Sequence, residues 1–177
     1  MRFHRREDRF AHEVWVADRG AWVQGFASRE GSPLDDWPTS PPFQSLNVEI
    51  RAGERPVALL VGMAGHSHWS ASIELDPAAA CVTFDVACRT RQRGSLGSCY
   101  RTLLPLAELQ ARRAAFASGD ALAPTLELEL CEQIGLARLE LAGELTRIRA
   151  MPSSAIVAAQ TIRWGYKVSL RPAGPSA

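Results

Sequence analysis

The sequence has no long apolar run and no apolar segment near its N-terminus. Its longest run of apolar residues, Val57 to Ala64, is far too short to cross a bilayer, since a membrane-spanning helix needs about 20 residues. The first eight residues are mostly charged, so no secretory signal is expected. We therefore expect a cytoplasmic protein with no membrane partner.

An excess of charge and closely spaced cysteine pairs are also missing. The net charge of the 177 residues is only +1, which gives no overall attraction for nucleic acid, and we expect no nucleic-acid partner. None of the four cysteines forms a C-x-x-C pair, which argues against a zinc ribbon or a thioredoxin-like motif. Their even number permits disulfides, but in a cytoplasmic protein reduced thiols are favoured. No cofactor is expected.

What is present is the composition of an ordinary folded domain. Hydrophobic residues make up 46% of the chain and charged residues 22%, which excludes a disordered or collagen-like protein. The length fits one domain over residues 1–177, because domains cluster near 100–150 residues. No internal repeat and no linker divides the chain.

Apolar and polar residues alternate with a period of two along much of the chain, which indicates β-strands with one face on a core. The clearest case is residues 162–170, where every second residue is apolar. The expected inward residues of this and four similar segments are Leu46, Val48, Ile50, Val82, Phe84, Val86, Leu126, Leu128, Leu130, Leu139, Leu141, Leu145, Ile162, Trp164, Tyr166, Val168 and Leu170.

Turn residues separate these segments. Residues 18–20 (Asp-Arg-Gly) and 52–54 (Ala-Gly-Glu) are short linkers of the kind that join antiparallel neighbours. About nine or ten strands are expected, which is more than one small open sheet usually carries. The sequence therefore predicts an all-β, mainly antiparallel fold, either a β-sandwich or a closed β-barrel.

One or two short helices are expected beside the strands. Residues 105–118 begin with Pro105, are rich in alanine and contain no β-branched residue. Leu106, Leu109 and Phe116 recur near helical spacing, so we expect a surface helix that covers one end of the sheets. Residues 152–160 are a weaker candidate for a second helix.

The strongest candidate for a functional site is the polar face of one strand over residues 65–75. In a strand, alternate side chains point the same way, so its apolar face would hold Trp69, Ala71, Ile73 and Leu75. The side chains expected on the opposite face are His66, His68, Ser70, Ser72 and Glu74. A turn at residues 76–79 would fold the next strand back and bring Asp85 and Arg89 to the same face.

Two histidines on one strand face can bind zinc, copper or iron. The chain has no histidine after His68, so a third ligand would have to be Glu74, Asp85 or His12. The alternative is a solvated outer face on which these residues have no ligand. We favour the solvated face over a metal site.

Two loops are further candidates. Residues 89–98 carry arginines at alternate positions (Arg89, Arg91, Arg93) beside glycines and serines, a set that suits a carboxylate or phosphate. Residues 31–45 hold four prolines and Trp37, and long loops of this kind are often functional. Trp37 could face a ligand, or it could fold back and close one end of the sheets.

No nucleophile elbow or other complete catalytic set occurs in the sequence. The sequence therefore favours a non-enzymatic module that binds a small molecule or a protein partner. Two alternatives remain open. One is a metal-assisted or acid–base enzyme that uses His66, His68, Glu74 and Asp85. The other is a structural subunit of a homo-oligomer, with the polar face or an edge strand as its interface.

Overall fold

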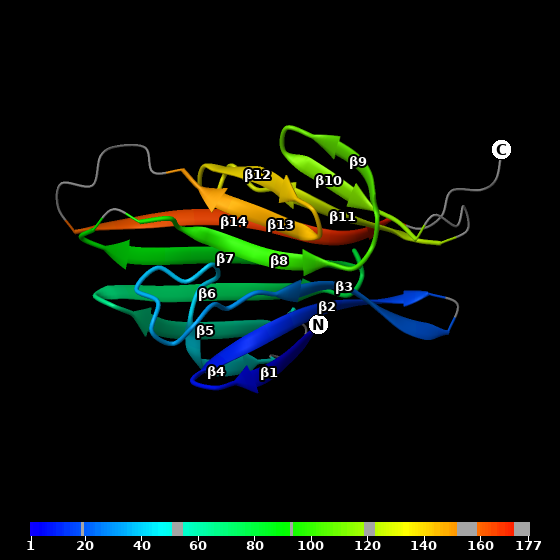
Figure 1. The fold of residues 1–177 in the computed structure, drawn as a ribbon. Helices are drawn as coiled ribbons and strands as arrows, with labels where there is room; N and C mark the ends of the chain where they lie inside the picture. Colours follow the sequence, from blue (N-terminus) through cyan, green and yellow to red (C-terminus); the bar gives the residue numbers. More distant parts are fainter. Residues whose placement is uncertain (19, 51–54, 93, 119–122, 152–158, 172–177) are drawn as a thin grey trace.

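The computed structural model of the chain describes residues 1–18, 20–50, 55–92, 94–118, 123–151 and 159–171. In these ranges the chain forms two antiparallel β-sheets that lie face to face (Figure 1). The described residues include no helix, and thus no helix long and apolar enough to cross a membrane. The all-β, antiparallel prediction is confirmed.

The two sheets differ in size. The smaller sheet has six strands, in the spatial order β1 (Arg2–Arg6), β2 (Arg9–Asp18), β3 (Ala21–Ser28), β8 (Gly97–Thr102), β13 (Leu145–Ala150) and β12 (Ala137–Ala142). The larger sheet has eight strands, in the order β4 (Phe43–Glu49), β5 (Val57–Ala64), β6 (Ser67–Asp76), β7 (Cys81–Thr90), β14 (Gln160–Arg171), β11 (Thr125–Leu130), β10 (Arg113–Phe116) and β9 (Leu106–Gln110). Each sheet ends in two edge strands, so the fold is sandwich-like, and the closed-barrel alternative is wrong.

The core lies between the sheets and includes most of the predicted inward residues. The prediction is wrong for Leu145, which pairs with Ala142 across a two-residue turn and shares its outward-facing side. Phe84, Trp164 and Tyr166 are at most 1% exposed, and Trp164 meets Trp69 edge to face with ring centroids 6.1 Å apart. The stripes of β7, β11 and β14 are adjacent because these strands are neighbours in the larger sheet. The prediction of inward residues over 162–168 is confirmed.

A short chain of polar groups crosses this core. Nε2 of His12 lies 2.7 Å from the hydroxyl oxygen of Tyr100, which lies 2.5 Å from the hydroxyl oxygen of Tyr166. The indole N–H of Trp164 donates to Ser98 Oγ nearby, at 3.1 Å. Burial lowers the pKa of His12 to about 3, so the imidazole is neutral at ordinary pH. Burial likewise raises the pKa of both tyrosines.

The expected helix over 105–118 is wrong. Its described residues form the β9–β10 hairpin, with a turn at Ala111 and Arg112. The high helix propensity is overridden because the hairpin adds β10 to β11 and thereby buries Ala114 and Phe116. Phe116 packs edge to face on Phe26, with centroids 5.2 Å apart. The second candidate helix, at 152–160, lies outside the described residues over 152–158.

The strand count and one inward stripe also differ from expectation. The described residues form 14 strands where nine or ten were expected, because short strands such as β1, β9 and β10 have no clear alternation. On β4, Val48 is 52% exposed, and Ile50 just after the strand is 74% exposed. β4 is the outermost strand of the larger sheet, and the smaller sheet does not cover these two residues.

Candidate functional site

The predicted polar face lies on the outer side of the larger sheet, away from the core. β6 and β7 pair in the expected register, with His68 opposite Arg89, Ser72 opposite Asp85 and Glu74 opposite Thr83. Trp69, Ala71 and Ile73 point inward and are buried, as predicted. His66 is a correction: it lies in the two-residue turn between β5 and β6, beside Gly65 at φ +52°, and not on the strand face.

The acidic residues of this face are engaged in ion pairs and lie away from the histidines. Asp85 pairs with Arg163, and Glu74 lies 2.7 Å from Arg55. Asp85 is level with Ser72, four residues along the strand from His68, which amounts to about 13 Å at 3.3 Å per residue. Among the described residues, no three His, Cys, Asp or Glu side chains come together in a group that could hold a metal ion.

Two depressions adjoin at His68 and Arg89. One has a volume of about 450 Å³ and is lined by His66, Arg91 and neighbouring residues of the β7 end. The other, of about 560 Å³, reaches over Ser70 to Val61 and Met63 on β5. Both lie on the open surface of the larger sheet, and their histidines and arginines are exposed. The predicted arginine cluster is only partly described, since Arg93 lies outside the described residues.

The proline-rich loop between β3 and β4 folds back onto the smaller sheet. Ser40 Oγ donates to the carbonyl oxygen of Cys99 on β8 at 3.0 Å and accepts from the amide N–H of the same residue at 2.9 Å. The hydroxyl of Thr39 donates to the carbonyl oxygen of Arg29 at 2.7 Å. Trp37 is half-buried against Gly94, where a Cβ atom would lie 2.2 Å from the indole ring. These contacts hold the loop as a wall beside β8.

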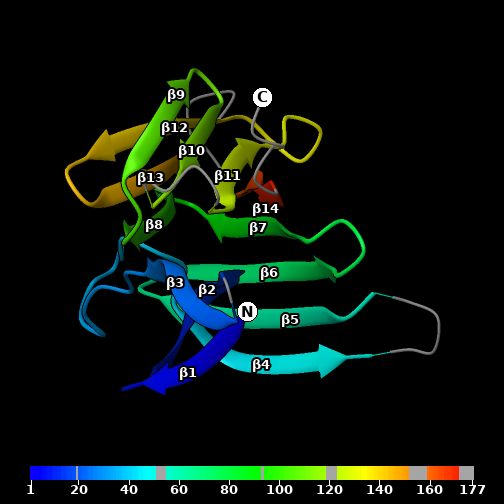
Figure 2. The same cartoon turned by 90° about the vertical axis from the view of Figure 1, so that its right-hand side faces the viewer.

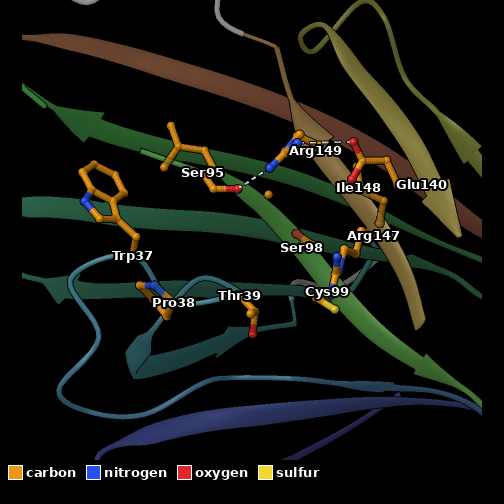
Figure 3. Close-up of a pocket in the computed structure, with 12 residues that line it drawn as sticks. Trp37, Pro38, Thr39, Ser95, Ser98, Cys99, Glu140, Arg147, Ile148 and Arg149 are labelled. Atoms are coloured by element: carbon orange, nitrogen blue, oxygen red, sulfur yellow. Dashed lines mark hydrogen bonds and ion pairs between the residues drawn. The ribbon is translucent and has the colours of Figure 1, made fainter. Parts of the chain in front are cut away.

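Between this wall and the outer face of β8 and β13 lie two adjoining cavities that share Thr39, Cys99 and Arg147. We refer to them together as the Arg147 cleft. The first, of about 250 Å³, runs from Trp37 to Arg149 (Figure 3). The second, of about 420 Å³, runs from Arg147 to Arg29 and the buried Glu30. The two candidate loops predicted from the sequence, residues 31–45 and 89–98, both border this cleft, but the arginines of β13 and the residues at the far end were missed.

Strand register explains why Arg147 has no partner. Arg147 lies directly opposite Glu140 on β12 and opposite Cys99 on β8. The Glu140 carboxylate is already engaged, since it lies 2.6 Å from Arg138 and 3.4 Å from Arg149. Arg149 also donates to Ser95 Oγ at 3.1 Å, a contact drawn in Figure 3. The side chain of Arg147 thus makes no hydrogen bond or ion pair with any described residue.

At the far end of the cleft, not every arginine is paired with a carboxylate. The guanidinium of Arg29 has no partner within the described ranges. Arg9 is buried and pairs with Asp8 at 2.8 Å, which lowers the pKa of that carboxyl. Glu30 is 6% exposed, and its nearest cation is Arg6 at 4.0 Å. The two unpartnered guanidinium groups therefore border a cavity whose single buried carboxylate has only a distant cation.

The chemistry available in the cleft is recognition of an anion. Guanidinium groups suit carboxylate and phosphate oxygens, and the Trp37 indole at the opposite end offers an apolar surface for a flat group. Cys99, the thiol that borders both parts of the cleft, is buried and forms no hydrogen bond with a histidine among the described residues, so it does not form a nucleophile–base pair there. The sequence signal that could have found the cleft is the alternation Arg147-Ile148-Arg149 opposite a single acidic residue, Glu140.

The chain was compared with protein-family models, with curated proteins and with solved structures, and it matches none of them. Its function is therefore argued from the geometry of the cleft and the sheets.

Proposed function

We propose that this protein is a non-enzymatic binding module that takes a small anionic molecule, a carboxylate or a phosphate, in the Arg147 cleft. The observation that carries the proposal is the unpartnered Arg147 at the place where the two cavities join. Arg147 has a directly opposed carboxylate, that of Glu140, which two other arginines engage. A bound anion would supply the partner that the fold leaves out.

The rest of the cleft supports an ordered site in preference to a merely charged surface. Ser40 and Thr39 fix the loop wall by hydrogen bonds to β8 and to the end of β3. A wall that is already in place loses little entropy when a ligand binds. The volumes, about 250 and 420 Å³, suit a molecule of one or two small rings or a short diacid. The depressions at His68, by contrast, are bounded only by one face of the larger sheet and by the turns at its end.

The test is a thermal-shift and calorimetry screen with inorganic phosphate, succinate and adenosine monophosphate. A ligand at about 100 times its Kd stabilises the folded protein by about 2.7 kcal/mol, which is a readily measured rise in Tm. In Arg147→Gln the ligand loses one charge-assisted hydrogen bond, so Kd is expected to rise about tenfold or more.

The matched control is Arg101→Gln. Arg101 is an exposed arginine on the same sheet and pairs with Glu144 at 3.1 Å, outside the cleft. Its replacement should leave Kd within twofold. If no probe in the screen binds, or if Arg147→Gln and Arg101→Gln weaken binding equally, the proposed site is wrong.

A further inference from the structure

The four edge strands of the sandwich differ in how well they are protected against pairing with another strand. An edge strand presents unpaired backbone N–H and C=O groups, and charged side chains along it discourage such pairing. β1 carries three arginines, β12 has Arg138 and Glu140, and β9 has Glu108 at its centre. On β4 the only charged residue is the last one, Glu49. β4 is thus the least protected of the four described edges.

Exposed apolar side chains gather around this edge. Val48 and Ile50 are 52% and 74% exposed on the side of β4 that faces the smaller sheet. On the other side, Leu59, Val61 and Met63 form a stripe along the neighbouring strand β5, and each is at least 40% exposed. Single exposed apolar residues are ordinary, but a group around one open edge marks an interaction surface. β4 and β1 lie at the same end of the sandwich (Figures 1 and 2).

The residue order of β4 fits a second copy of itself. In an antiparallel pair with a two-fold axis at Val48, Leu46 of one copy lies opposite Ile50 of the other, and Val48 lies opposite Val48. Asn47 then lies opposite Glu49, so no like charges are opposed. All three apolar side chains fall on one face, and both exposed ones gain an apolar neighbour. The bulge between Phe43 and Ser45 lies outside this segment.

We propose that the protein forms a two-fold symmetric dimer through antiparallel pairing of β4 with β4, centred on Val48. Both subunits would then share one continuous 16-stranded sheet, and the β5 stripes would flank the junction. This is an isologous contact, which closes on itself and stops at two copies. The paired segment of five residues is about 17 Å long. Such a short segment buries less surface than a standard protein–protein interface, so we expect a dissociation constant on the order of micromolar.

Sedimentation velocity from 5 to 500 µM tests the dimer. The wild-type chain should shift from monomer to dimer over this range. Val48→Lys opposes two ammonium groups on the axis and should raise the dissociation constant at least tenfold. The matched control Val61→Lys changes a valine of similar exposure that lies one strand in from the paired edge, on the opposite face of the sheet from Val48. It leaves the β4 backbone groups and the Val48 contact unchanged and should still dimerise. Unchanged Tm values of both variants would show that each is folded.

Cysteine cross-linking tests the register, in a Cys81→Ser background that removes the one described cysteine that is not buried. Opposed residues of antiparallel strands have Cα atoms 4.5–5.5 Å apart, within reach of a disulfide. Val48→Cys should therefore form a covalent dimer on mild oxidation, whereas Asn47→Cys should not. A wild-type monomer at 500 µM overturns the proposal. Equal cross-linking of the two cysteine variants also overturns it, and so does a dimer that persists in Val48→Lys. Either result would mean that the copies pair through another surface.

Discussion

The buried histidine of the core makes the protein sensitive to acid in a way that can be isolated. His12 is 3% exposed, and aromatic rings of Phe84 and Tyr100 lie within 6 Å of its own ring. Its Nε2 has the Tyr100 hydroxyl as partner, whereas its Nδ1 is buried with no partner. The cationic form would add a second N–H with no acceptor. The folded protein therefore binds a proton at this site far more weakly than the unfolded chain does.

The magnitude follows from the pKa of His12, which burial lowers from 6.5 to about 3. Between these two values the unfolded state binds more protons than the folded state, so stability falls as pH falls. At pH 5, about 1.5 units below the ordinary pKa, the loss is about 2 kcal/mol at 1.36 kcal/mol per unit. It continues to grow until pH reaches about 3.

The assay is urea unfolding of wild-type and His12→Phe protein at pH 7.5, 6.5, 5.5 and 5.0. Phenylalanine removes the titrating group and the unpartnered Nδ1, and Tyr100 keeps its contact with the Tyr166 hydroxyl. Carboxylates titrate in both proteins, so they cancel in the difference. We expect the free energy of unfolding of the wild type to fall by about 2 kcal/mol more than that of the variant between pH 7.5 and 5.0.

A difference between the two proteins that stays constant over this pH range would refute the reasoning, since it would mean that the imidazole is not held neutral by the core. The exposed His68 provides the control. His68→Gln is expected to leave the free energy of unfolding within about 0.5 kcal/mol of the wild-type value.

Two further predictions concern other buried contacts. Burial raises the pKa of the Cys88 thiol to about 12, so at pH 8 a thiol reagent should label the partly exposed Cys81 and leave native Cys88 unmodified; fast labelling that peptide mapping assigns to Cys88 would contradict this. Gly94→Ala should displace the Trp37 indole, because a Cβ atom would lie 2.2 Å from its ring, and a red shift of tryptophan emission that is absent in a Trp37→Phe background would report it.

The sequence alone predicts most of the larger sheet because its strands are long and bury one face. The alternation of β7, β11 and β14 and the β6–β7 register could all be derived from residues near each other in the chain. The β9–β10 hairpin could not be, because its alanines favour a helix locally and only the distant partners Leu128 and Phe26 reverse that preference. Local propensity carries no information about such partners.

The Arg147 cleft was beyond sequence reasoning for a related reason. Arg147 and Arg149 resemble any solvated strand face, and their significance arises only when β13 lies between β8 and β12. The loop wall likewise depends on Ser40 reaching Cys99, 59 residues away in the chain. The polar face at His68, by contrast, could be predicted together with its register, because β6 and β7 are joined by a short turn.

The position of β14 has a consequence for how the chain folds during synthesis. Residues 160–171 form an interior strand of the larger sheet, between β7 and β11, although they follow all the other described strands in the chain. Until they are available, β7 and β11 both expose open edges with apolar faces, so the nascent chain is vulnerable to aggregation and cannot complete this sheet strand by strand. We expect folding to be slow, and any truncation before residue 160 to leave the sheet in two separate pieces.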